Sequence, residues 1–220
     1  MPLSNMANLS EQIADHITEK IIRLEIRPGE RIMETKIADE LNVSRSPIRE
    51  ALRILEKNRL VELIPRRGAR VTELSGIFIV QLCDVLTALF RLMARQCVEN
   101  GTAENLEKID AAARRSRDCA AQDDVYGYYT ALFDFALATL TATHNPLLEQ
   151  VIHELLPNVR RLIYASFSIQ KATLERNVAA VMAGNRYLQE RNAKMAEIEV
   201  SNYIENAKAF ALENTIFPTS

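Results

Sequence analysis

The apolar pattern changes once along the chain, near residues 73–76, and this change constrains the fold more than any other feature of the sequence. The part before it combines short helical patterns with two short extended stretches. The part after it contains only long helical patterns. With 48% hydrophobic and 25% charged residues, the chain has the profile of a compact helical protein and not of a disordered or collagen-like one. The sequence therefore predicts a mainly α protein with two domains, residues 1–75 and 76–220.

The first domain is predicted to contain three helices and a hairpin. Arg27-Pro28-Gly29 ends the first helix, because this turn sequence cannot continue it. Ser46-Pro47 begins the third helix, since serine suits the N-cap and proline suits the first helical position. Pro65-Arg66-Arg67-Gly68 joins two extended stretches into a hairpin with a basic tip, where glycine fits a residue of positive φ. The helices are expected at residues 9–24, 34–41 and 46–58, and the strands at 60–64 and 69–72.

Basic residues are concentrated between Ser44 and Val71. This stretch holds eight Lys and Arg against three Asp and Glu, although the whole chain has a net charge of −2. Ile48, Leu52 and Leu55 form the apolar stripe of the third helix, so arginines spaced by four residues should line the opposite side. Such charges most simply indicate a solvent-exposed helix face. The N-cap of the third helix, its arginines on one side and the basic hairpin together favour a polyanionic partner instead.

Three short helices followed by a hairpin are the parts of a winged helix-turn-helix, whose third helix enters the major groove of DNA. Guanidinium groups grip a phosphate or pair bidentately with guanine. Hydroxyl and backbone N–H groups at a helix start favour a phosphate oxygen. The candidate DNA-contacting residues are Ser44, Arg45, Ser46, Arg49 and Arg53 on the third helix, and Arg66, Arg67 and Arg70 on the wing.

The second domain is predicted to be all helical. Gly101 and Gly184 are expected as C′ glycines, Asn145-Pro146 as a cap with a first-turn proline, and Pro157 as a kink. No apolar run is expected to reach the roughly 20 residues of a membrane span. The helices are expected near residues 77–100, 103–121, 124–142, 146–167, 171–183 and 186–213.

The cysteines and the first residues indicate the compartment. Residues 1–10 lack the positive region and apolar core of a secretory signal, so we expect a cytoplasmic protein. Cys83, Cys97 and Cys119 are odd in number and lack C-x-x-C spacing. This pattern argues against a disulfide framework or a zinc knuckle and favours reduced core thiols.

The segment from Asn42 to Leu55, preceded by the sequence Arg-Pro-Gly-Glu-Arg-Ile at residues 27–32, resembles the DNA-binding domain of GntR-type bacterial transcription regulators. The resemblance covers residues 9–74. It implies that Glu50 orients an arginine and that Gly68 is the wing glycine. It also implies that residues at the DNA include Ser44, Arg45, Ser46, Pro47 and Arg49, with Gly68 on the wing.

Residues 77–213 resemble, more loosely, the FCD effector domain of the FadR subfamily. The residues that carry this resemblance are the helix and the Asn-Pro cap at positions 135–148. The resemblance implies a homodimer that binds a small metabolite in each helical bundle and changes its grip on a palindromic operator. Many members hold a divalent metal with one Asp and three His. The matching positions here are Leu132, Ala136, a residue near Leu174 and one within Lys194–Ala196, so we predict no metal and no cofactor.

The same resemblance points to an effector cavity that is mostly apolar, with phenolic hydroxyls. Leu86 or Thr87, together with Phe90, replaces the arginine and glutamate usual in the pocket. A buried carboxylate needs a guanidinium partner, for which Arg91, Arg160 or Arg161 is available. Alternatively, these side chains simply fill the bundle core. The candidate ligand-binding residues are Leu86, Phe90, Arg91, Tyr129, Leu132, Phe133, Ala136, Arg160 and Tyr164.

We therefore expect a homodimeric regulator that binds a double-stranded DNA operator and responds to a small molecule, such as an apolar or aromatic acid. One alternative is a regulator with no ligand. An enzyme is a further alternative, but G-x-S-x-G, Walker, G-x-G-x-x-G and H-E-x-x-H motifs do not occur in the sequence. We expect no association with a membrane.

Overall fold

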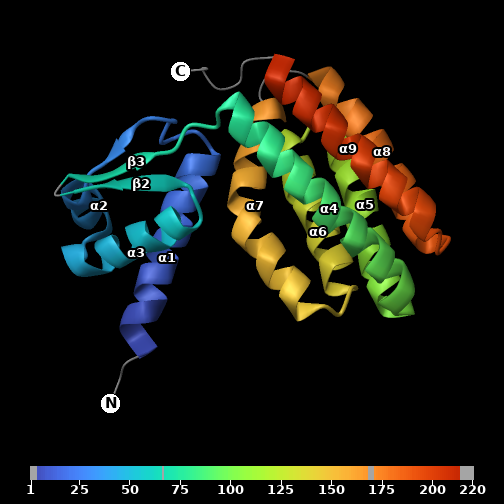
Figure 1. Ribbon diagram of the computed structural model, residues 1–220, viewed down its shortest axis with the longest axis horizontal. Helices are drawn as coiled ribbons and strands as arrows, with labels where there is room; N and C mark the ends of the chain where they lie inside the picture. Colours follow the sequence, from blue (N-terminus) through green and yellow to red (C-terminus); the bar gives the residue numbers. More distant parts are fainter. Residues whose placement is uncertain (1–3, 66, 168–170, 214–220) are drawn as a thin grey trace. The chain divides into compact units, whose positions relative to one another are not determined.

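The computed structural model describes residues 4–65, 67–167 and 171–213, which form two compact units (Figure 1). The first unit comprises Met1–Ser75 together with Glu154–Ala165. The second comprises Gly76–His153 and Ser166–Ile216. The chain therefore divides after Ser75, and a later segment returns to the first unit.

The first unit has the predicted winged helix-turn-helix fold. Its helices are α1 (Ser4–Ile22), α2 (Glu34–Leu41) and α3 (Arg45–Lys57), and its strands are β1 (Arg31–Ile32), β2 (Val61–Ile64) and β3 (Gly68–Val71). The strands form an antiparallel sheet in the order β1-β3-β2. The sequence did not predict strand β1, because two residues are too few to show the alternation of apolar and polar side chains that indicates a strand. It forms through pairing with β3, which sets Arg31 opposite Arg70 and Ile32 opposite Ala69.

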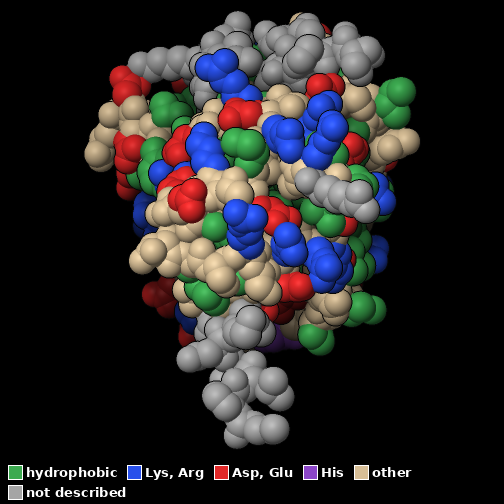
Figure 2. Space-filling model, turned by 90° about the vertical axis from the view of Figure 1, so that its left-hand side faces the viewer, with side chains coloured by type: hydrophobic (Ala, Val, Ile, Leu, Met, Phe, Trp, Pro, Cys, Tyr) green, Lys and Arg blue, Asp and Glu red, His purple; other side chains and the backbone are tan. Residues whose placement is uncertain are grey.

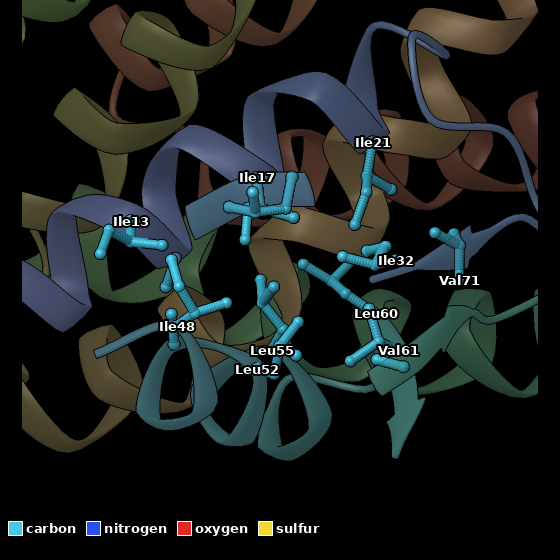
Figure 3. Packing of buried hydrophobic residues seen from close by; sticks show 14 of the residues in the cluster. Ile13, Ile17, Ile21, Ile32, Ile48, Leu52, Leu55, Leu60, Val61 and Val71 are labelled. Carbon is cyan, nitrogen blue, oxygen red and sulfur yellow. The ribbon is translucent and has the colours of Figure 1, made fainter. Parts of the chain in front are cut away.

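One aliphatic core holds the first unit together. The side chains of α1 point towards those of α3, and the start of the wing closes the end of the core (Figure 3). Ile17, Ile48 and Leu55 are fully buried, and Leu52 is 1% exposed. Complete burial of such side chains stabilises the fold by roughly 1.5–3 kcal/mol each. The predicted apolar stripe of α3 is therefore confirmed.

The wing depends on Gly68. Its φ is +85°, and a Cβ atom at this position would lie 2.2 Å from the carbonyl oxygen of Ile32. Any other residue would be strained by its backbone conformation and would also push β1 away from β3. The predicted positive φ of Gly68 is confirmed. The close approach of Gly68 to β1, which was not predicted, is a second reason why this position requires glycine.

Helix α3 begins earlier than predicted. Its N-cap is Ser44, with the extended backbone angles φ −72° and ψ 164°, and the first helical residue is Arg45. The prediction that Ser46 is the cap and Pro47 the first helical residue was therefore wrong. Proline is nevertheless accommodated, because the backbone N–H groups throughout the first turn have no intrahelical acceptor.

The second unit is a helical bundle that contains five of the six predicted helices and the first part of the other one (Figure 1). Helix α4 packs against α9, α6 and α8, and helix α5 packs against α6 and α8. Asn145 caps α7 as predicted, because its side-chain oxygen accepts a 3.0 Å hydrogen bond from the backbone N–H of Leu148. The bounds are α4 (Gly76–Asn100), α5 (Ala103–Ala121), α6 (Val125–Thr141), α7 (Pro146–Phe167), α8 (Lys171–Gln189) and α9 (Ala193–Glu213).

The predicted break at Gly184 was wrong. Helix α8 continues through this glycine to Gln189, and the chain turns instead at Arg191, whose φ is +56°. The guanidinium of Arg191 donates 2.7 Å hydrogen bonds to the carbonyls of Val98 and Gly101, which hold the turn in place. Gly101 follows α4 as predicted, but it lacks the left-handed conformation of a C′ glycine.

Helix α4 also corrects the expectation about apolar runs. Among the described helices, it is the one whose length and composition would also suit a membrane span. Ile79, Leu82 and Leu86 are buried in the fold. Cys83 and Cys97 on the same helix are free and buried, as predicted, and burial raises the pKa of each thiol to about 11. Helix α4 thus packs in the bundle through one side, whereas Ile77 and Val85 on the same helix stay exposed.

The later part of helix α7, Glu154–Ala165, packs within the first unit. Arg161 is fully buried there, and its guanidinium donates hydrogen bonds to the carbonyl and the hydroxyl of Thr72. Asn158 donates a 2.8 Å hydrogen bond to the carbonyl of Asn58. Desolvation lowers the pKa of Arg161 to about 10, so the group stays charged at neutral pH and depends on its acceptors.

We predict that Arg161→Ala lowers the free energy of unfolding of the first unit by about 2–4 kcal/mol, because it leaves a cavity and removes the donors to Thr72. Arg160 is the matched control, since its guanidinium lies 2.6 Å from the carboxylate of Glu19 but is 31% exposed. Arg160→Ala should therefore cost under about 1 kcal/mol. Urea denaturation followed by circular dichroism measures both losses. Equal losses would contradict the structural role of Arg161.

Candidate nucleic-acid interface

The exposed side of α3 carries the three predicted arginines. Arg45, Arg49 and Arg53 follow one another at intervals of four residues and are all exposed. The other side of α3 is aliphatic and packs on α1 (Figure 3). Because residues at this spacing share a face of a helix, the structure brings the three guanidinium groups into one row.

The three arginines differ in their partners. The Nε of Arg49 lies 2.8 Å from the Glu34 carboxylate of helix α2, and a terminal nitrogen of Arg53 lies 2.7 Å from Glu50. Arg45 has no ion pair with any residue of the described ranges. The expectation that Glu50 orients an arginine fits its contact with Arg53. One cation of the row is thus free, and two are paired with carboxylates.

The start of α3 presents hydroxyl groups as predicted. Ser44 and Ser46 are exposed, and the Ser44 side chain makes no capping hydrogen bond, so its hydroxyl is available to a ligand. Pro47, in contrast, is buried in the first turn. A helix N-terminus with free hydroxyl groups favours an anionic oxygen.

The wing adds a second group of cations. Arg67 and Arg70 are exposed, whereas Arg66 lies outside the described residues. Arg31 of β1 joins them, because it is exposed, stands opposite Arg70 and donates a 2.8 Å hydrogen bond from Nε to the carbonyl of Arg67. Sequence reasoning assigned no role to Arg31. Arg31 is part of the Arg-Pro-Gly-Glu-Arg-Ile stretch, but this stretch did not show that strand pairing would bring the residue beside the wing.

Acidic side chains are interspersed with these cations. Figure 2, which faces the side shown at the left of Figure 1, shows Lys and Arg gathered with Asp and Glu among them. On the exposed face of the sheet, Glu62 stands opposite Arg70, which is itself opposite Arg31. The surface is therefore a set of basic groups with fixed acidic neighbours, which is suited to selective contacts as well as to general attraction.

Seven of the candidate ligand-binding residues lie in the second unit. On α6, Tyr129 and Phe133 are buried, and their rings have centroids 4.9 Å apart and an interplanar angle of 57°. On α4, Leu86 is buried and Phe90 is half-buried, whereas Arg91 is exposed and donates hydrogen bonds of 3.2 and 3.1 Å to Glu197. The remaining two residues of the seven are Leu132, which is buried, and Ala136, which is half-buried.

The other two candidates lie on helix α7. Arg160 and Tyr164 belong to the first unit, where Arg160 pairs with Glu19. Arg161, considered as a partner for a ligand carboxylate, is held there by Thr72. Among the residues that the structure describes, no group of three or more His, Cys, Asp or Glu side chains could hold a metal ion.

Two family models match the chain. The model for bacterial regulatory proteins of the gntR family matches residues 9–71, and the model for the FCD domain matches residues 81–206. The first match spans α3 and the wing, and the second spans most of the helical unit. The gntR description names regulatory proteins and not enzymes.

Known relatives agree with this assignment. YdhC of Bacillus subtilis, an uncharacterized HTH-type transcriptional regulator, is 34% identical over 99 residues, which are 45% of this chain and 44% of YdhC. The chain thus spans less than half the length of that relative. RspR, an HTH-type transcriptional repressor of Escherichia coli, is 23% identical over 159 residues, which are 72% of this chain and 70% of RspR.

The solved structure of E. coli McbR/YncC has a TM-score of 0.83 to this chain at 17% identity, covering 94% of this chain and 98% of that one, and so shows a shared fold. Together with the two family models, which follow each other along the sequence, this likeness accounts for both units. The chain belongs to the gntR family of bacterial regulatory proteins, in the group that carries an FCD domain.

Proposed function

We propose that the protein binds double-stranded DNA through α3 and the wing and thereby regulates transcription. The observation that carries this proposal is the row of exposed arginines on α3, directly opposite a fully buried aliphatic face. A helix of this kind can enter the major groove without exposing its core. Binding to the bacterial chromosome would place the protein in the cytoplasm.

In this proposal, the arginines of α3 and those of the wing sheet contact different parts of the DNA. Arg45 is the first residue of α3, has no ion pair among the described residues and stands beside two exposed hydroxyl groups, so it suits a phosphate. Arg49 and Arg53 follow one and two turns further along the helix and can reach base edges or the opposite strand. Arg31, Arg67 and Arg70 on the wing are suited to the flanking backbone.

The active form is proposed to be a homodimer on a palindromic operator. A single module of this size reads a short half-site, and two modules related by a two-fold axis combine their selectivity. Half-sites about one helical turn apart would then match two copies of α3.

The helical unit is proposed to bind a small apolar or aromatic molecule among Leu86, Phe90, Tyr129, Leu132, Phe133 and Ala136. The support is the aromatic and aliphatic character of these side chains on α4 and α6. A carboxylate on the ligand would have to compete with Glu197 for Arg91. The close contact between Tyr129 and Phe133 equally suits a plain core, which favours a regulator without a ligand as the second candidate.

Helix α7 offers a route for control. Among the described helices, it is the one whose residues are divided between the two units, with Pro146–His153 in the second and Glu154–Ala165 in the first. A ligand that shifts the early part of this helix would act on the hydrogen bonds that Arg161 and Asn158 make in the first unit. A coupling free energy of about 1–3 kcal/mol would change DNA affinity by roughly 5- to 150-fold.

We predict that Arg45→Ala and Arg49→Ala both weaken binding to a duplex selected from a random-sequence pool, with different signatures. Arg49→Ala should cost about 1–3 kcal/mol on the selected duplex and less on unrelated DNA, because it removes a contact with a base edge. Arg45→Ala should weaken binding to all duplexes and lower the salt slope by about one, because it removes a phosphate contact. Fluorescence anisotropy at several salt concentrations measures these effects.

Arg117→Ala on α5 is the matched control. This arginine is also exposed and is paired with Asp118, so the variant makes the same change in net charge in the other unit. DNA affinity should change little. If the α3 variants bind every duplex as tightly as this control does, the proposed DNA surface is wrong.

We predict that a screen of small apolar and aromatic compounds, with and without a carboxylate, identifies ligands that raise the melting temperature. A ligand at 100 times its Kd stabilises the fold by about 2.7 kcal/mol. Ala136→Phe should abolish the shift by filling the proposed space. If the active compounds shift the variant and the wild type equally, the location is wrong, and a screen without any shift favours the ligand-free regulator.

A further inference from the structure

The contact between Arg49 and Glu34 joins two helices of the first unit. Glu34 is the first residue of α2, and one of its carboxylate oxygens accepts a 2.8 Å hydrogen bond from the Nε of Arg49 in α3. The Glu34 side chain is 22% exposed, whereas that of Arg49 is 61% exposed. The carboxylate therefore lies at the base of the arginine, and the guanidinium extends beyond it towards solvent.

The atom that makes this bond matters. Arginine has five N–H donors, and the bond to Glu34 uses the single donor on Nε. The two terminal nitrogens remain, and together they form the planar edge that pairs bidentately with guanine O6 and N7. A long side chain fixed at Nε loses less rotamer freedom on binding than a free one. Glu34 thus leaves the reading edge of Arg49 available and restricts its direction.

The neighbouring arginines lack this arrangement. Arg53 uses a terminal nitrogen for its bond to Glu50, and both side chains of that pair are more than half exposed. Arg45 has no ion pair with a described residue. Within the row, Arg49 is therefore the arginine that is anchored from a second helix through Nε.

We infer that Glu34 is a positioning residue that gives the protein its preference for one base pair, because it directs the terminal nitrogens of Arg49 at a base edge. This inference rests on the proposed binding of α3 to DNA. It assigns selectivity to the pair, whereas the free Arg45 supplies attraction that does not depend on sequence. Glu34 lowers the net positive charge of the surface, so its contribution is to discrimination and not to general affinity.

The test compares Glu34→Ala with Glu50→Ala, which removes the other carboxylate that pairs with an α3 arginine and makes the same change in net charge. Affinity is measured for the selected duplex, for duplexes altered at one base pair and for unrelated DNA. Glu34→Ala should reduce discrimination at one base-pair position by about 5-fold or more, within the range of one bidentate contact. Affinity for unrelated DNA should stay equal or rise. Glu50→Ala should shift all affinities in parallel.

Two further variants separate positioning from a structural effect. Glu34→Gln keeps an acceptor oxygen for Nε and should retain part of the discrimination, and it carries the test if Glu34→Ala does not fold by circular dichroism. In an Arg49→Ala background, loss of Glu34 should have no further effect on discrimination. Parallel shifts for Glu34→Ala, or an undiminished effect without Arg49, would overturn the inference. If Arg49→Ala itself changes nothing, or the wild type prefers no duplex, the proposed DNA-binding function fails as well.

Discussion

The packing of one aliphatic face of α3 against α1 is the constraint on which the rest of the first unit depends. Ile48 and Leu55 are fully buried, and Leu52 is 1% exposed, so the helix cannot rotate about its axis without exposing them. That orientation places Arg45 and Arg49 in solvent. The hydrophobic core therefore does more than stabilise the fold, because it decides which side of α3 is available to a partner.

The features that could be predicted from the sequence are those that depend on residues close together in the chain. Helical periodicity predicted the buried and exposed sides of α3, and the glycine in the basic hairpin predicted a positive φ at Gly68. Asn145 and Pro146 predicted the start of α7. Each of these features is decided by residues within one or two turns of the position concerned, so a pattern in the sequence is enough to show them.

Features that depend on distant residues could not be predicted in this way. Strand β1 exists because Gly68 lets β3 approach Ile32, and the turn after α8 is set by hydrogen bonds from Arg191 to carbonyls near the end of α4. The burial of Arg161 against Thr72 likewise joins residues far apart in the sequence. The contact of Arg49 with Glu34 belongs to this class, which is why the arginine row was found from the sequence and its differing partners were not.

The central claim is that the solvent side of α3 meets DNA while its aliphatic side stays buried. A crystal structure of the protein with a duplex selected from a random-sequence pool tests it most directly. The account predicts α3 in the major groove, with the terminal nitrogens of Arg49 within hydrogen-bonding distance of a base edge and Arg45 at a phosphate. A complex in which the duplex lies on another surface and leaves α3 in solvent would contradict it.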